Sequence, residues 1–126
     1  MKLLLTLILW TVLLPIDSDS EIDCKTFRTG KFRLVDKDQE YIIERNDSIQ
    51  IENDLKKNTM SRFKVTWVTD CEYELDILEA NEEAMNFFKG KTLSIQILET
   101  SDNGYKYEAK LKGTDLKLIH RVERVN

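Results

Sequence analysis

Residues 63–77 read FKVTWVTDCEYELDI, and this stretch decides the fold class. Its odd-numbered positions are apolar apart from Thr69 and Cys71, and its even-numbered positions are charged or Thr apart from Val68. Side chains of a strand alternate between the two faces of a sheet, so a period of two places one face on a core and the other in water. We therefore expect one long amphipathic strand here, with Trp67 on its inner face.

The chain begins with a segment that is typical of a secretory signal peptide. Lys2 precedes an apolar run over residues 3–14, and the small residues Ser18 and Ser20 suit cleavage after Ser20. The run is shorter than the roughly 20 apolar residues of a membrane-spanning helix. No lipobox precedes Cys24. We expect a signal peptide over residues 1–20, no transmembrane span in the mature chain, and a periplasmic or secreted location.

The mature chain is expected to form a single β-rich domain over residues 21–126. Removing 20 of the 126 residues leaves 106, and it takes away one Lys and two Asp, so the formal charge changes from −4 to −3. About 100 residues bury one modest core. A mildly acidic balance argues against specific nucleic-acid binding.

Two cysteines, Cys24 and Cys71, remain after cleavage. An even count in an exported chain predicts a disulfide. A reactive thiol is the alternative, but neither a neighbouring His nor a Cys-X-X-Cys spacing is present to favour the thiolate. The bond would join segments separated by intervening strands, which only a curled sheet allows. The disulfide therefore predicts curvature.

The rest of the chain alternates between short amphipathic strands and polar turns. A short helix is expected where Asn81 can cap, where Phe87 and Phe88 share a face with Ala84, and where Gly90 ends the segment. The expected strands cover residues 27–36, 41–44, 48–55, 63–77, 91–100 and 105–112, with a seventh after the Gly113-Thr114 turn. We expect a mainly β fold, an antiparallel meander of about seven strands in a small or incomplete barrel, with the helix between strands 4 and 5.

Strand register is predicted from loop lengths, because a wrong length puts apolar residues on opposite faces. A three-residue loop over residues 45–47 is preferred to a two-residue turn that would place Ile43 opposite Gln50. In the last loops, Gly104 is expected in the left-handed region and Gly113 in a type II′ turn. The expected pairs are Ile43 with Ile49, Tyr41 with Ile51, Ile51 with Val65, Ile97 with Ala109, Tyr107 with His120, and Tyr105 with Val122.

An acidic row follows the outer face of residues 63–77. It consists of Asp70, Glu72, Glu74 and Asp76. Alternate residues of a strand lie about 7 Å apart and do not converge on one cation. We expect a solvated face, with no metal and no cofactor.

A basic row follows the outer face of the last hairpin. Lys106, Lys110, Lys117 and Arg121 belong to it, and the expected register sets Lys106 opposite Arg121 and Lys110 opposite Lys117. Like charges that face each other are mildly destabilising, which makes a surface for an acidic partner one interpretation. The alternative is a solvated face whose lysines deter edge pairing.

Aromatic residues with inward parity form a candidate pocket. It contains Tyr41, Trp67, Tyr73, Tyr107 and His120. Such a set is first of all a core and secondarily a ligand pocket. His120 beside Tyr107 is a candidate acid–base pair, although the sequence places no Ser or Cys nucleophile next to it; a structural His bonded to Tyr107 is the alternative.

Three blocks carry a family resemblance: CKTFRTGKF at 24–32, RNDSIQIE at 45–52 and VTWVTDCEYEL at 65–75. They resemble a family of small exported proteins of Bacteroidetes, of the flavobacterial kind, that are often labelled DNA topoisomerase IV. That label has no support here, since the chain is far too short and has no ATPase motif. The resemblance implies an envelope or secreted protein and brings no catalytic residues. Lipocalins are a looser comparison, because Gly30-Lys31-Phe32 lacks their Gly-X-Trp.

The expected function is that of a non-enzymatic, monomeric binding or interaction module of the bacterial envelope. Its partner would be a small apolar ligand held beside Trp67, or an envelope protein. One alternative is a small hydrolase or isomerase that uses His120 with an inward carboxylate. Another is an inhibitor or structural module that acts through the basic C-terminal hairpin.

Overall fold

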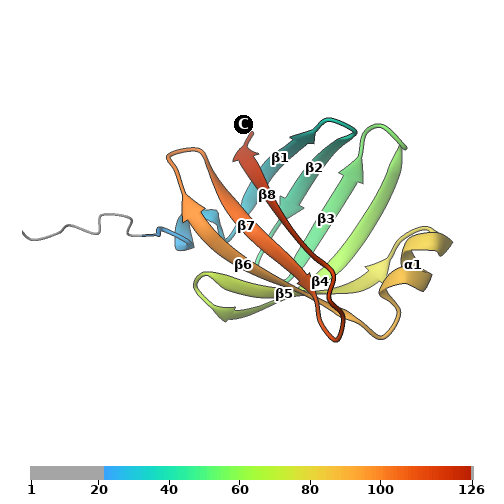
Figure 1. Ribbon diagram of the computed structural model, residues 1–126. Helices are drawn as coiled ribbons and strands as arrows, with labels where there is room; N and C mark the ends of the chain where they lie inside the picture. Colours follow the sequence, from blue (N-terminus) through green and yellow to red (C-terminus); the bar gives the residue numbers. More distant parts are fainter. Residues whose placement is uncertain (1–21, 126) are drawn as a thin grey trace, which may run out of the picture.

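The computed structural model describes residues 22–125, which form a closed barrel of eight antiparallel strands (Figure 1). The elements are η1 (Lys25–Phe27), β1 (Gly30–Asp36), β2 (Gln39–Arg45), β3 (Ile49–Asp54), β4 (Thr59–Thr69), β5 (Glu72–Glu79), α1 (Glu82–Phe88), β6 (Thr92–Thr100), β7 (Gly104–Leu111) and β8 (Lys117–Arg124). Each strand pairs with its neighbours in sequence, and β8 returns to β1. The predicted antiparallel barrel is confirmed. The expected signal peptide lies outside the described residues.

The stretch 63–77 is two strands and not one. A turn at Asp70 and Cys71 separates β4 from β5, and the Thr69 hydroxyl accepts a hydrogen bond from the Cys71 amide (3.2 Å). The register shifts between Trp67 and Thr69, so Trp67 still pairs with Tyr73, another odd-numbered residue. The inner face therefore keeps its odd parity through the turn. For this reason the alternation showed no break, and seven strands were predicted instead of eight.

The disulfide between Cys24 and Cys71 is formed across a sequence separation of 47. It joins the segment before η1 to the β4–β5 turn, and not to the middle of a strand. Phe27, where the predicted first strand would have begun, is instead the last residue of the helical turn η1, and β1 begins at Gly30. The curvature that the bond predicted is present as complete closure of the sheet.

The register of the last hairpin is confirmed, with Tyr107 opposite His120 and Tyr105 opposite Val122. The β6–β7 register is wrong by two residues, because Ala109 faces Ile95 and not Ile97. Gly104 has no positive φ and belongs to β7, so it is not the expected left-handed loop residue.

The β2–β3 and β3–β4 registers are also wrong, and this error has the largest consequence. Ile43 lies opposite Glu52, and Ile51 lies opposite Arg62 and not Val65. Arg45 is buried and belongs to β2, whereas a loop position had been expected. Extending β2 by this residue lengthens the paired region and moves Gln50 and Glu52 to the inner face.

The predicted helix is confirmed as α1. The Asn81 side chain accepts a hydrogen bond from the Ala84 amide (2.8 Å), and Gly90 follows the helix with φ of 68°. A helix of two turns is marginal alone and needs tertiary packing. Phe88 provides it by meeting Phe63 edge-to-face at 5.6 Å between ring centroids.

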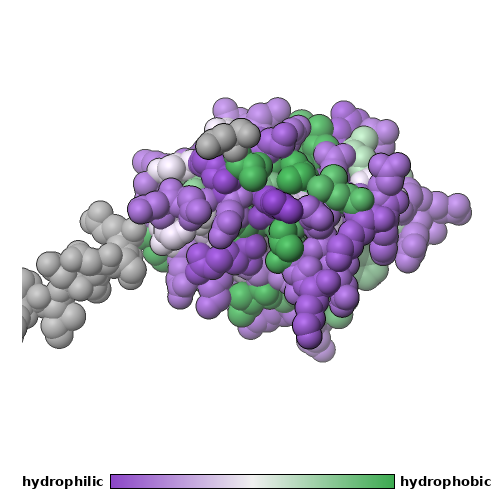
Figure 2. All heavy atoms as spheres, turned by 90° about the horizontal axis from the view of Figure 1, so that it is seen from above, coloured by the Kyte–Doolittle hydropathy of each residue, from purple (hydrophilic) through white to green (hydrophobic). Residues whose placement is uncertain are grey.

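The two ends of the barrel differ. η1 and α1 lie on opposite sides of it (Figure 1). The end beside η1 is closed by a cluster of fully buried side chains that includes Phe27, Phe32 and Tyr105. The other end carries α1 and the β1–β2, β3–β4 and β7–β8 turns. The outer surface is mostly hydrophilic on the face seen in Figure 2, with scattered hydrophobic residues.

Candidate functional site

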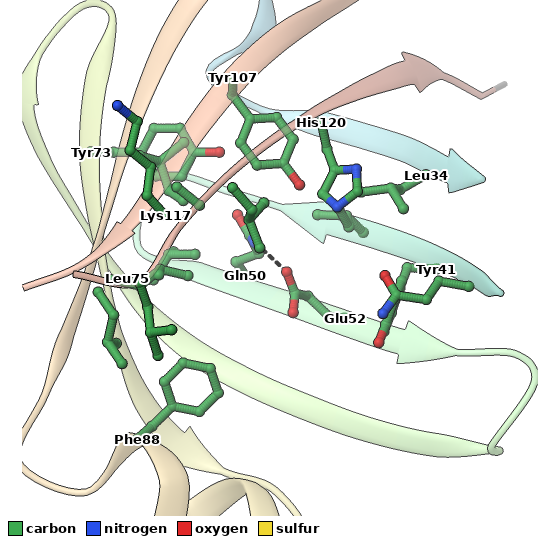
Figure 3. Close-up of a pocket in the computed structure, with 18 of the residues that line it drawn as sticks. Leu34, Tyr41, Gln50, Glu52, Tyr73, Leu75, Phe88, Tyr107, Lys117 and His120 are labelled. Carbon is green, nitrogen blue, oxygen red and sulfur yellow. Dashed lines mark hydrogen bonds between the residues drawn. The ribbon is translucent and has the colours of Figure 1, made fainter. Parts of the chain in front are cut away.

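The half of the barrel toward α1 is hollow. A cavity of about 430 Å³ lies inside it, lined by residues of seven strands and by Phe87 and Phe88 of α1 (Figure 3). Its walls are largely aliphatic and include Leu34, Ile43, Leu75, Leu93, Ile95 and Leu111. Phe87, Leu116 and Leu118 line the cavity and are about half exposed (47%, 55% and 47%), so the cavity opens to solvent beside α1, the β7–β8 turn and β8.

Arg45 lies at the η1 end of the cavity, where it bonds the lining residues Gln50, Tyr73 and Tyr105. Its side chain is 4% exposed, although burying a cation is costly unless all its donors are satisfied. The guanidinium makes five hydrogen bonds, which equals its number of N–H donors. The acceptors are the Arg28 carbonyl (3.1 Å), the Gln50 Oε1 (2.9 Å), the Tyr73 hydroxyl (3.1 Å), the Phe27 carbonyl (2.7 Å) and the Tyr105 hydroxyl (2.9 Å).

These bonds connect five segments of the chain at the η1 end. Arg45 of β2 holds η1 and its C-cap residue through the Phe27 and Arg28 carbonyls, and it holds β3, β5 and β7 through one side chain each. The guanidinium also lies over the Tyr73 ring at 4.7 Å and the Phe32 ring at 4.9 Å, which favours a cation. A fully engaged Arg45 has no donor left to offer a ligand.

Gln50 connects Arg45 to Glu52. Its Oε1 accepts from Arg45, and its Nε2 donates to the Glu52 Oε1 (3.1 Å), so the amide orientation is set from both sides (Figure 3). Burial raises the pKa of the Glu52 carboxyl, while the Gln50 hydrogen bond and the Arg45 charge act in the opposite direction. Glu52 thus presents a carboxyl to the cavity that is poorly compensated when ionised.

Two tyrosine hydroxyls lie near this carboxyl. Burial raises the pKa of Tyr107, and the Glu52 charge adds to that effect. Burial also raises the pKa of Tyr41, together with the charge and hydrogen bonding of Asp54 and, to a smaller extent, the charge of Glu52. Both phenols therefore stay protonated at neutral pH and are available as hydrogen-bond donors or acceptors.

The structure brings four of the five predicted pocket residues to the cavity and leaves one outside. Tyr41, Tyr73, Tyr107 and His120 line it. Trp67 does not: its ring packs on Tyr73 at 4.7 Å between centroids, and its other neighbours include Arg28, 4.9 Å from the ring. Its buried Nε1 has no hydrogen-bond partner within residues 22–125. Trp67 therefore belongs to the closed end.

Sequence reasoning missed the charged and amide groups of the site. Arg45, Gln50 and Glu52 were assigned to a loop or to the outer face, because the isoleucines beside them were taken as the inner residues. The alternation in residues 49–52 fits two registers, one with the isoleucines inside and one with Gln50 and Glu52 inside. The polar residues Arg45, Gln50 and Glu52 were the signal in the sequence for the second register.

The acidic row is dispersed into separate contacts. Asp76 accepts from the Thr92 hydroxyl (2.5 Å), Glu74 pairs with Lys112 (2.6 Å), and Asp70 pairs with Lys25 (3.7 Å). In the part of the chain that the structure describes, no cluster of His, Cys, Asp and Glu is arranged to hold a metal ion.

The basic row is largely paired with outer-face carboxylates. Glu99 contacts both Lys106 (4.0 Å) and Arg121 (3.4 Å), and Glu108 contacts Lys117 (3.5 Å). Lys106 lies opposite Arg121 and Lys110 opposite Lys117, as predicted. Glu99 and Glu108 therefore offset the repulsion between the opposed cations. That repulsion was the reason for interpreting the basic row as a surface for an acidic partner.

Comparison with protein-family models, with curated proteins and with solved structures finds no significant match for this chain. Within residues 22–125, no helix has the length and apolar character needed to cross a membrane. The cavity lining supplies carboxyl, phenol, imidazole and amide groups but, among the described residues, no Ser, Thr or Cys nucleophile. These groups can donate and accept hydrogen bonds toward a ligand.

Proposed function

We propose that this chain is an exported, non-enzymatic binding protein of the bacterial envelope that holds a small amphipathic ligand inside its barrel. The observation that carries this proposal is the cavity of about 430 Å³, which lies within the usual range for small-molecule sites. Apolar walls with a few convergent polar groups are the common pattern of such sites. The polar groups here include Gln50, Glu52, Tyr41, Tyr107 and His120.

The arrangement of the barrel supports the same function. β8 returns to β1 through the pairs Phe32–Arg124 and Arg33–Glu123, which closes the sheet around the cavity. The Arg45 cluster fills the η1 end, and the exposed lining residues Phe87, Leu116 and Leu118 lie toward the other end, where a ligand can enter. The disulfide and the signal-like N-terminus support export.

A neutral fluorescent probe tests the proposal. N-phenyl-1-naphthylamine brightens in apolar sites, and we expect saturable binding to the oxidised protein at micromolar concentration. The matched variants are Ala109→Phe and Lys110→Phe, adjacent residues of β7. Ala109 is 4% exposed and lines the cavity, whereas Lys110 is exposed on the outer face.

Ala109→Phe is expected to weaken probe binding at least tenfold by filling the cavity, while Lys110→Phe binds like the unmodified protein. Circular dichroism of both variants establishes that the barrel is retained. The proposal fails if the unmodified protein shows no saturable binding of the probe, or if both variants bind it equally well.

A further inference from the structure

The cavity contains an acceptor that the protein itself uses only in part. A carboxylate offers about four lone-pair sites, and the structure gives Glu52 one hydrogen bond, from Gln50. Its side chain points from β3 into the cavity, whose lining also includes Tyr41 and Tyr107 (Figure 3). An acceptor in such a place is available to a ligand.

The charge of Arg45 favours the ionised form of this carboxyl, but less strongly than burial disfavours it. Arg45 is the cation that acts on Glu52, but it makes no direct hydrogen bond to it. All five donors of Arg45 are directed to the Phe27 and Arg28 carbonyls, Gln50 and two tyrosine hydroxyls. Lys117 lines the cavity, yet its side chain is 55% exposed and its ammonium pairs with Glu108 (3.5 Å). Neither Arg45 nor Lys117 is thus free to pair with a ligand carboxylate deep in the cavity.

We propose that the cavity selects ligands whose buried polar end is a hydrogen-bond donor, a protonated amine above all, with Glu52 as its acceptor, and that it rejects carboxylates. This inference rests on the proposed function and adds the ligand class. An ammonium compensates the buried carboxylate, a hydroxyl donates to it without adding charge, and a ligand carboxylate places like charges together.

The direction of the Glu52 pKa agrees with this selectivity. Burial raises that pKa, which means that the empty cavity disfavours the ionised carboxyl. A bound ammonium favours the ionised carboxyl and so opposes the effect of burial. The other titratable or charged groups around the cavity are Tyr41 and Arg45 of β2, Tyr73 of β5, Tyr105 and Tyr107 of β7, and Lys117 and His120 of β8.

The experiment compares octylamine, 1-octanol and octanoate as competitors of N-phenyl-1-naphthylamine at pH 7.5. The three share one chain length and differ in the polar end. In the unmodified protein we expect octylamine to compete at least tenfold better than octanoate, with 1-octanol between them. In Glu52→Gln the preference for octylamine is expected to disappear, because the amide still accepts from Gln50 but carries no charge.

Glu44→Gln is the control variant. Glu44 lies on the outer face of β2, where it pairs with Lys31 (3.6 Å), so its loss is expected to leave the competition order unchanged. Lowering the pH to 4.5 is expected to weaken octylamine in the unmodified protein and not in Glu52→Gln. Comparing the two proteins at both pH values isolates the contribution of Glu52.

The inference is overturned if octanoate competes as well as octylamine, or if Glu52→Gln keeps the same order of competitors. In either case probe binding and its loss in Ala109→Phe still support a ligand cavity. Failure of the probe and of all three competitors to bind the unmodified protein overturns the proposed function together with the inference.

Discussion

Arg45 determines where the interior is filled and where it is hollow. A buried guanidinium is tolerated only when its donors are paired, and this one recruits two backbone carbonyls, one amide and two phenols. Those partners gather at the η1 end and fill it. The aliphatic residues in the half of the barrel toward α1 do not surround such a central side chain, and the space between them is the cavity.

Replacing Arg45 with Met tests this role. The substitution keeps much of the side-chain volume but leaves several buried acceptors unpaired, and each unpaired group costs about 1–3 kcal/mol. We expect the free energy of unfolding in urea to fall by at least about 3 kcal/mol. Arg33→Met is the control, since Arg33 is half exposed and pairs with Glu40 on the surface (2.6 Å); its loss costs less than about 1 kcal/mol. Equal effects of the two substitutions would contradict the assigned role.

Glu52 gives the stability of the protein a specific pH dependence. Burial raises its pKa in the folded state above the ordinary value of 4.5. Its contribution to stability is therefore fully present below the unfolded pKa and is lost as pH rises through the folded pKa. Glu52→Gln removes that loss. We expect the Tm of Glu52→Gln to exceed that of the unmodified protein at pH 7 and the difference to shrink toward pH 4.

Thermal unfolding followed by circular dichroism at several pH values measures this difference. Glu44→Gln serves again as the control, because Glu44 forms an exposed pair and its removal provides no such gain at pH 7. A Tm of Glu52→Gln below that of the unmodified protein at neutral pH would contradict the assignment.

At this scale the sequence predicted the aromatic lining of the cavity but not its charged centre. Tyr107 and His120 were placed opposite each other because a single turn at Gly113 determines their register. Glu52 was missed because isoleucine was expected inside. The alternation over residues 49–52 is equally regular whether the isoleucines or Gln50 and Glu52 face inward. In the structure, the buried Arg45 pairs with the buried Gln50, which places the polar residues inside.

At the scale of elements, the β7–β8 contact depends on Gly104. A Cβ built on this residue would lie 2.1 Å from the Val122 carbonyl oxygen and 3.1 Å from the Glu123 Cα, so the two backbones approach too closely for any side chain. Glycine is required here for space and not for a left-handed backbone. The sequence did not distinguish these two reasons, because the residue also follows a polar loop.

Gly104→Ala and Gly113→Ala separate the two reasons by magnitude. Overpacking of a rigid site costs up to about 3 kcal/mol, and we expect that full amount or more for Gly104→Ala, where backbone must move. Gly113 has φ of 80° with nothing within 4 Å of its Cβ position, so Gly113→Ala costs only about 1 kcal/mol of conformational strain. Urea unfolding compares them. A smaller loss for Gly104→Ala than for Gly113→Ala would show that the close approach relaxes easily.

The β4–β5 hairpin shows a limit of pattern reasoning for whole elements. The register shift near Trp67 lets odd-numbered residues face inward on both sides of the turn. Periodicity indicates which face of the sheet a residue occupies. It does not reveal a hairpin turn when odd-numbered residues face inward both before and after the turn. The helix was predicted more securely because a cap, an apolar face and a terminating glycine are local signals.

At the scale of the whole molecule, stability and binding are assigned to opposite ends of the barrel. The disulfide, η1 and the Arg45 cluster occupy one end. The cavity, its entrance and α1 occupy the other. The closed end connects β2, β3, β5 and β7 through the bonds of Arg45. These bonds therefore also position the cavity residues farther along the same strands. This division predicts that the disulfide affects stability far more than it affects the ligand site.

The Cys24→Ser and Cys71→Ser double variant tests this division. Closing a loop of 47 residues stabilises a protein by about 4 kcal/mol in the chain-entropy model. We expect a loss of roughly that size in urea unfolding, and reductant is expected to destabilise the unmodified protein but not the double variant. At low urea the folded fraction of the double variant should still bind N-phenyl-1-naphthylamine with an affinity within about threefold of the original. Loss of probe binding by a double variant that circular dichroism shows to be folded would mean that the closed end shapes the cavity directly, because Tyr73 and Tyr105 belong to both.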